Sequence, residues 1–209
     1  MELEQELKKA LETLRQSPER KFNQTVDLII NLQKFDIKKT PINLFIKVPY
    51  KIKDKKVAGF LETKNKDVDT ITFDDFKKYK EKKEMKKLSK NYDFFIAQTS
   101  LMPKVATEFG KVLGPSGKMP SPQLGIILNA DEKSIKELKE KVNNSIKIKL
   151  KEPSIKLSIA KQNMKDEEII ENAMTIYREI FKVLPKGKEN LKNVEIKFTM
   201  TKPVKIKIR

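Results

Sequence analysis

The stretch Tyr92-Asp93-Phe94-Phe95-Ile96-Ala97 is a nearly continuous apolar run of strand length. A run without polar alternation is typical of a strand that is covered on both faces of a sheet. Similar short runs precede and follow it, at 57–61 and 126–128, and helical spacing appears between and after them at 74–88, 102–113 and 131–142. Strands that alternate with helices predict a small doubly wound α/β unit in the middle of the chain.

The flanking segments follow a different pattern. Apolar residues at positions 3, 7, 10, 11 and 14 form a helical stripe, and Ser17-Pro18 ends it. A second helix is predicted over 23–34, with Asn23 as its N-cap. Alternation of apolar and polar residues predicts strands over 42–48, 146–150 and 155–159, and a basic closing strand over 194–209; helical spacing predicts an amphipathic helix over 166–184.

Because the two ends of the chain resemble each other in kind, the middle unit is predicted to be an insertion. We expect a discontinuous α+β domain made of 1–54 and 147–209, and an inserted α/β domain over 55–146. Insertions are tolerated where the ends of the host segments lie close together. The split domain carries a formal charge of +11 and the insert +6, so the positive field is stronger on the split domain.

The composition limits the possible functions. The 209 residues include 46 Lys and Arg against 29 Asp and Glu, a formal charge of +17 that predicts an anionic partner. Cysteine and histidine are both absent, which excludes disulfides, thiol nucleophiles, thiolate or imidazole metal sites and imidazole acid–base catalysis. No cofactor and no metal site are expected. The acidic N-terminus and the lack of a 20-residue apolar run predict a soluble intracellular protein without a membrane partner.

Three stretches have both a structural and a binding interpretation. The Gly/Pro-rich segment 111–122 lacks the glycine and the Ser or Thr of a phosphate loop, so it is either a rigid turn or a loop that offers N–H groups and Lys118 to nucleic acid. The closing strand, with Lys202, Lys205, Lys207 and Arg209, is either a solvated edge or a binding strand. Phe22 precedes the expected helix, as a hydrophobic staple or as a ring that stacks on a base.

These stretches resemble one family. Gly110-Lys111-Val112-Leu113-Gly114-Pro115-Ser116-Gly117-Lys118-Met119-Pro120 is similar to the signature of the family of large-subunit ribosomal protein L-one, the protein of the mobile stalk beside the tRNA exit site. Lys21-Phe22-Asn23-Gln24-Thr25-Val26-Asp27 resembles its opening element, and Thr199-Met200-Thr201-Lys202-Pro203-Val204-Lys205 its closing element. The resemblance covers essentially the whole chain, and Lys202-Pro203 favours the archaeal branch.

The resemblance implies a discontinuous α+β RNA-binding domain with an inserted Rossmann-like, three-layer α/β/α domain. It implies a non-catalytic constituent of the large ribosomal subunit that binds ribosomal RNA, assists release of deacylated exit-site tRNA and represses its own mRNA, in the cytoplasm and on the ribosome. The implied RNA-binding residues are Lys21, Phe22, Thr25, Lys161, Thr199, Met200, Thr201 and Lys202. The signature loop comprises Gly114, Pro115, Gly117, Lys118, Met119 and Pro120, and is not implied to be the main RNA site.

Three positions depart from the family pattern. Thr201 and Ala160 stand where glycine is usual, and Ser116 stands where arginine is usual. A side chain at 201 is expected to alter a close approach of the backbone to RNA.

Two other classes of function compete with RNA binding as interpretations of the sequence. An enzyme with a nucleotide site in the α/β insert would need one of the phosphate fingerprints, and both are missing. A protein that docks to an acidic partner or an anionic membrane would need large apolar anchors on a basic helix, which the lysine-rich segment 77–90 offers only sparsely.

Overall fold

A computed structural model describes residues 2–18, 20–37, 40, 42–79, 81–128, 131–150 and 152–207. Its fold mixes helices with both antiparallel and parallel sheets, as the sequence predicts. The chain divides into two compact units: unit 1 is Met1–Ile52 with Asn144–Arg209, and unit 2 is Lys53–Asn143. None of the helices in the described ranges is long and apolar enough to cross a membrane.

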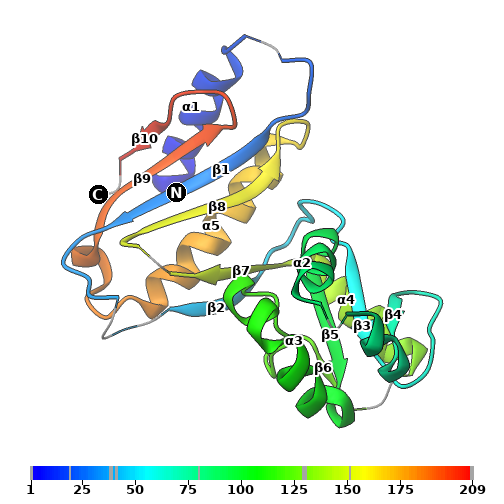
Figure 1. The fold of residues 1–209 in the computed structure, drawn as a ribbon. Coiled ribbons are helices and arrows are strands. Elements are labelled where there is room, and N and C mark those ends of the chain that lie inside the picture. The colour runs from blue at the N-terminus through cyan, green and yellow to red at the C-terminus, as the bar shows by residue number, and fades with distance from the viewer. Residues whose placement is uncertain are drawn as a thin grey trace. The chain divides into compact units, whose positions relative to one another are not determined.

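Unit 1 is built on a four-stranded antiparallel sheet of order β10-β9-β1-β8 (Figure 1). Its strands are β1 (Thr25–Leu32), β8 (Ser154–Lys161), β9 (Leu191–Phe198) and β10 (Val204–Ile206). The helices α1 (Glu2–Arg15) and α5 (Asp166–Val183) contact each other and pack on the same core. Alternate residues of β1 are buried beneath them, so the sheet has one covered and one more open face.

A second, two-stranded antiparallel sheet in unit 1 stands where the chain leaves for unit 2 and returns from it. It pairs β2 (Asn43–Lys47) with β7 (Ser145–Lys149). Just beyond the paired strands, the Val48 N–H donates to the Asn144 carbonyl at 2.7 Å. The outgoing and returning segments are therefore held side by side.

Unit 2 contains a parallel sheet of order β4-β3-β5-β6. Its strands are β3 (Val57–Phe60), β4 (Asp69–Ile71), β5 (Phe94–Gln98) and β6 (Ile126–Ile127). The helical elements are η1 (Phe73–Tyr79), α2 (Lys82–Asn91), η2 (Thr99–Leu101), α3 (Met102–Ser116) and α4 (Glu132–Asn143). All four residues of β3 are buried, which is typical of a parallel strand covered on both faces. Phe60, Phe76, Phe95 and Phe109 form the aromatic centre of this core.

The predicted second helix at 23–34 is wrong. These residues form β1, the strand that pairs with both β8 and β9. Val26, Leu28, Ile30 and Leu32 all point into the core with a period of two, and the branched side chains of Val26, Ile29 and Ile30 favour a strand. The interpretation of Phe22 as a hydrophobic staple is therefore also wrong, because a strand and not a helix follows this residue.

Smaller corrections concern the other boundaries. The expected helix 74–88 is divided into η1 and α2, and the short strand β4 has no counterpart in the prediction. The closing segment is a hairpin of β9 and β10 rather than one strand, with β10 at the edge of the sheet, where it pairs only with β9. Ile208 and Arg209 of the predicted strand lie outside the described residues.

The signature loop begins later than its glycines and prolines predict. Gly114 and Pro115 lie in the last turn of α3, which continues to Ser116. Gly117 ends the helix with a φ of 72°, a conformation that glycine adopts without a steric penalty. The Lys118 N–H donates to the Leu113 carbonyl and the Gly117 N–H to the Gly114 carbonyl, which is the Schellman arrangement of a helix end.

Candidate nucleic-acid interface

The topology of unit 1 brings the eight predicted RNA-binding residues to one end of its sheet. Because β1 runs antiparallel to β8 and β9, the start of β1 lies beside the ends of the other two strands. Thr25 pairs with Lys161, and Val26 pairs with Phe198, the last residue of β9. We call this end the strand-end surface; its predicted members are Lys21, Phe22, Thr25, Lys161, Thr199, Met200, Thr201 and Lys202.

Two threonines fix the centre of this surface. The Thr25 N–H donates to Thr199 Oγ1 at 3.0 Å, and the Thr199 N–H donates to the Thr25 carbonyl at 3.1 Å. The two hydroxyl oxygens are 2.8 Å apart and share a further hydrogen bond. Both hydroxyls are therefore positioned by the protein before any ligand arrives.

Gln24 is a residue of this surface that the sequence analysis missed. Its side chain is only 1% exposed, and its Oε1 accepts from the Met200 N–H at 3.0 Å. Its carbonyl accepts from the Gln162 N–H at 2.8 Å, at the turn between β8 and α5. Gln24 thus ties together two turns that flank β1. Only its place inside the opening element, between Phe22 and Thr25, signals this role.

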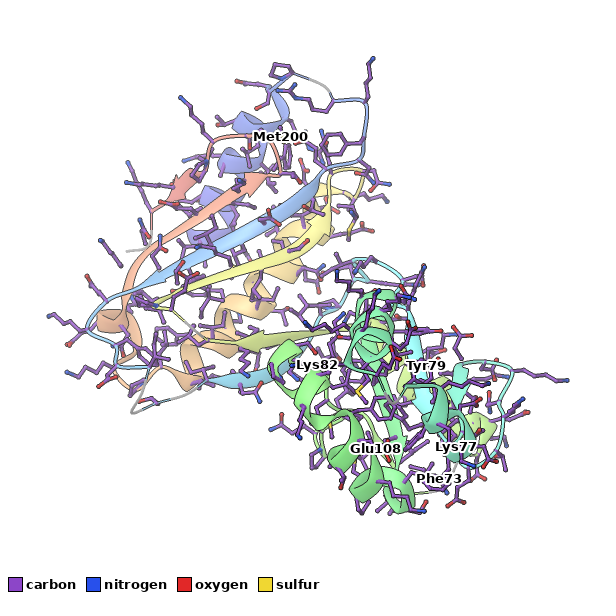
Figure 2. All side chains as sticks on the ribbon, in the orientation of Figure 1. Phe73, Lys77, Tyr79, Lys82, Glu108 and Met200 are labelled. Carbon is purple, nitrogen blue, oxygen red and sulfur yellow. The ribbon has the colours of Figure 1, made fainter. Side chains whose placement is uncertain are left out.

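Exposed apolar side chains lie among the cations of this surface. Phe22 is 51% exposed and Met200 is 59% exposed. Figure 2 shows Met200 on the turn between β9 and β10. Single exposed apolar residues are common on proteins, but here two stand beside Lys21 and Lys202, both exposed. A ring and a thioether on a fixed backbone suit contact with unstacked bases.

Two hollows flank the exposed apolar residues. One, of about 360 Å³, lies between the end of α1 and the β9–β10 turn and includes Met200, Thr201 and Lys202 in its lining. The other, of about 510 Å³, includes Lys21, Phe22 and Asn163. Arg20 lines both hollows and has no side-chain partner among the described residues, so it is a candidate contact beyond the eight predicted residues.

Two charged residues near the strand-end surface, Arg15 and Asp27, have structural and electrostatic roles. Arg15 forms an ion pair with Asp166 and donates to the carbonyls of Gln162 and Met164, so its guanidinium holds α1 to the turn before α5. Asp27 faces the open side of the sheet, where burial raises the pKa of its carboxyl, against the opposing effects of Lys197, the Thr25 hydroxyl and Lys161. The Asp27 carboxylate therefore offsets part of the positive charge of Lys197 and Lys161.

The departure at Thr201 is accommodated within the turn. Its Oγ1 accepts from the Phe198 N–H at 2.9 Å, and its own N–H donates to the Phe198 carbonyl at 3.1 Å. Among the described non-glycine residues only Lys34 has a positive φ, so the backbone of Thr201 does not require glycine. Ala160, the second departure, is fully buried opposite Val26.

The signature residues lie in unit 2 and have internal roles there. The Lys118 ammonium donates to the carbonyls of Ser89 and Tyr92 at 2.6 and 2.7 Å, which holds the end of α2 to the end of α3. Met119 packs against the core of unit 2, and Pro120 is buried. Ser116 donates to the Leu113 carbonyl at 2.9 Å, where the family usually has arginine. This geometry favours the interpretation of the loop as a rigid turn.

The described residues contain no group of three or more acidic side chains placed to hold a metal ion.

Comparison with known proteins gives consistent matches over most of the chain. The model of the ribosomal protein L1p/L10e family matches residues 13–202. A protein of Nanoarchaeum equitans named large ribosomal subunit protein uL1 is 35% identical over 203 residues, which cover 92% of this chain and 95% of that protein. The proteins of the same name from Pyrobaculum neutrophilum and Pyrococcus abyssi are 36% and 32% identical, over 96% and 90% of this chain and 92% and 89% of their own lengths.

Proposed function

The chain belongs to the ribosomal protein L1p/L10e family, and from this membership we propose that it is a protein of the large ribosomal subunit that binds ribosomal RNA through the strand-end surface. Members of this family are ribosomal proteins rather than enzymes. The observation that carries the proposal is the mutual hydrogen bonding of Thr25 and Thr199, which fixes a surface bearing Phe22 and Met200.

Different groups of the strand-end surface would provide affinity and specificity for RNA. Lys21, Arg20 and Lys202 are exposed cations that attract phosphates irrespective of sequence. Phe22 and Met200 contact unstacked bases or riboses, and such contacts discriminate between RNA shapes. The threonine hydroxyls, held at 2.8 Å from each other, add directional hydrogen bonds to ribose or phosphate oxygens. Affinity then comes mainly from the lysines and specificity from the apolar and hydroxyl groups.

The domain organisation is part of the same proposal. We infer that unit 1 is an RNA-binding domain and unit 2 an inserted Rossmann-like domain, each able to fold alone. Each unit has its own buried core, which supports this inference. All eight residues of the strand-end surface lie in unit 1.

Two further roles rest on the family resemblance of segments 21–27, 110–120 and 199–205. On the ribosome, in the cytoplasm, the protein would assist release of deacylated tRNA from the exit site. In its free form it would repress translation of its own mRNA. Repression requires a messenger segment that reproduces the shape of the ribosomal RNA site. The two RNAs would then compete for the same strand-end surface.

The first expected result is a strong salt dependence of RNA affinity. Each phosphate that a lysine or arginine neutralises releases counterions, so about five phosphate contacts give a slope of roughly −3 to −5 in a plot of log affinity against log salt. The measurement is titration of the full chain with the large-subunit RNA that co-purifies with it, between low and moderate salt. A flat response would contradict the proposal.

A further inference from the structure

Unit 2 contains a cavity of about 550 Å³, and none of its lining residues belongs to the strand-end surface. It opens at the amino ends of the parallel strands, where Val57 begins β3 and Asp69 begins β4. Nucleotides in open α/β sheets bind at the opposite, carboxyl ends of the strands, so this is not the nucleotide site of such a fold. Four lysines line the cavity: Lys55, Lys56, Lys66 and Lys139.

The protein itself holds two of these lysines in place. The Lys139 ammonium donates to the Asp67 carbonyl at 2.7 Å, and the Lys55 ammonium donates to the Val142 carbonyl at 2.7 Å. An ammonium has three N–H donors, so a single bond to a carbonyl leaves Lys139 able to donate to a ligand. Because these side chains are ordered in advance, a ligand does not have to immobilise them.

Both acidic side chains of the cavity lining have partners within the protein. Asp67 lies 3.6 Å from the ammonium of Lys136, which is outside the lining. Asp69 accepts a hydrogen bond from the Tyr92 hydroxyl, an interaction that, after burial, raises the pKa of Tyr92. Lys56 and Lys66 are exposed and have no side-chain partner among the described residues. The cavity therefore presents a surplus of positive charge.

The lowered pKa of the Lys55 ammonium makes anion binding in the cavity depend on pH. Burial lowers the pKa of its ammonium to about 8, and Lys53 acts in the same direction, while Asp93 opposes both. An anion in the cavity would stabilise the charged form and raise this pKa again. Anion binding is therefore linked to proton uptake above neutral pH.

We propose that this cavity binds a phosphate group of an RNA backbone, which gives unit 2 an RNA contact of its own. The inference rests on the proposed function, because the phosphate is taken to belong to the same ribosomal RNA. Lysines act as point charges towards phosphate, and the single aromatic residue of the lining, Tyr92, is held by Asp69. The contact therefore adds affinity without sequence preference.

The test compares two double variants of the full chain. Lys56→Gln/Lys66→Gln removes the two exposed lysines of the cavity. Lys86→Gln/Lys133→Gln removes the same charge from exposed positions of α2 and α4 outside the lining. We expect the cavity variant to bind ribosomal RNA about tenfold more weakly and to reduce the salt slope by about 1 to 2, while the control stays close to the unchanged chain. Equal losses in the two variants would overturn the inference.

A second probe separates RNA from free phosphate compounds. Inorganic pyrophosphate is titrated against the unchanged chain and the cavity variant by calorimetry. If pyrophosphate binds the unchanged chain, and the cavity variant keeps full RNA affinity, the cavity serves a free phosphate compound and the RNA contact is contradicted. Failure of the proposed function looks different, because the unchanged chain would then show no salt-dependent binding of ribosomal RNA at all.

The absence of cysteine permits a direct map of the contact. An iron chelate attached to Lys66→Cys generates hydroxyl radicals beside the cavity, and one attached to Lys133→Cys serves as the control. We expect a localised set of RNA backbone cleavages from position 66 that is lost on addition of excess unlabelled protein. The same cleavage pattern from both positions, or none from position 66, would contradict the contact.

Discussion

The double variant Phe22→Ala/Met200→Ala is expected to bind its specific RNA about 30- to 1,000-fold more weakly than the unchanged chain. A base stacked on an aromatic ring contributes about 1–3 kcal/mol, and apolar contact with Met200 adds roughly 1 kcal/mol. Affinity for random RNA should change little, because Lys21, Arg20 and Lys202 remain. The measurement is the ratio of specific to random RNA affinity at one salt concentration.

The matched control for this variant is Phe73→Ala in unit 2. Phe73 is 47% exposed, close to the exposure of Phe22, but it packs against Phe76 and lies beneath the ammonium of Lys104. We expect it to leave the affinity ratio unchanged. If the double variant instead unfolds at a lower temperature and keeps its affinity ratio, the two side chains serve the fold and not RNA recognition.

Asn172→Leu is expected to destabilise unit 1 by about 2–4 kcal/mol. Asn172 is fully buried on α5, and its Nδ2 donates to the carbonyls of Tyr50 and Ile159 at 3.0 and 2.9 Å. Its Oδ1 accepts from the Tyr50 N–H at 3.0 Å. Leucine has a similar size but leaves three backbone groups without partners, each at a cost of about 1–3 kcal/mol where water cannot replace the bond.

Denaturant unfolding of the full chain measures this effect, with Asn43→Leu as the control. Asn43 is exposed on β2 in the same unit, and its side chain is not needed by the strand pairing. Surface changes of this kind usually alter stability by less than about 0.5 kcal/mol. If Asn172→Leu were no more destabilising than Asn43→Leu, the segment after β2 would not depend on α5 for its hydrogen bonds.

The wrong helix prediction at β1 shows that the local spacing of apolar residues does not always decide between a helix and a strand. Leu28-Ile29-Ile30 is apolar without a break, so it satisfies a helical and a strand period at once. The decision depends on pairing with residues about 130 and 170 positions away, and a single sequence contains no signal for that pairing. The parallel strands β3 and β5 were predictable because full burial on both faces leaves a run with almost no polar residue.

The sequence motifs predict the members of the candidate site, but they do not predict its geometry. The motifs containing Phe22 and Met200 point to candidate residues, yet the hydrogen bonds between Thr25 and Thr199 join positions 174 residues apart. Gln24 was missed because glutamine is usually exposed, and only the structure shows that it is buried against the Met200 N–H. Glycine and proline usually end a helix, so the sequence predicts that the loop begins at Gly114, whereas α3 continues to Ser116 and Gly117 ends it.

The central claim is that unit 1 alone carries the specific RNA site. The most direct test deletes Lys53–Asn143 and joins Ile52 to Asn144 with a few glycines, which the hydrogen bond between Val48 and Asn144 permits. The resulting chain of about 118 residues is large enough to keep a stable core. We expect it to retain specific binding within about tenfold, equivalent to about 1.4 kcal/mol. A deletion variant that is folded by circular dichroism but has lost specific binding, while the isolated Lys53–Asn143 fragment retains it, would contradict the account.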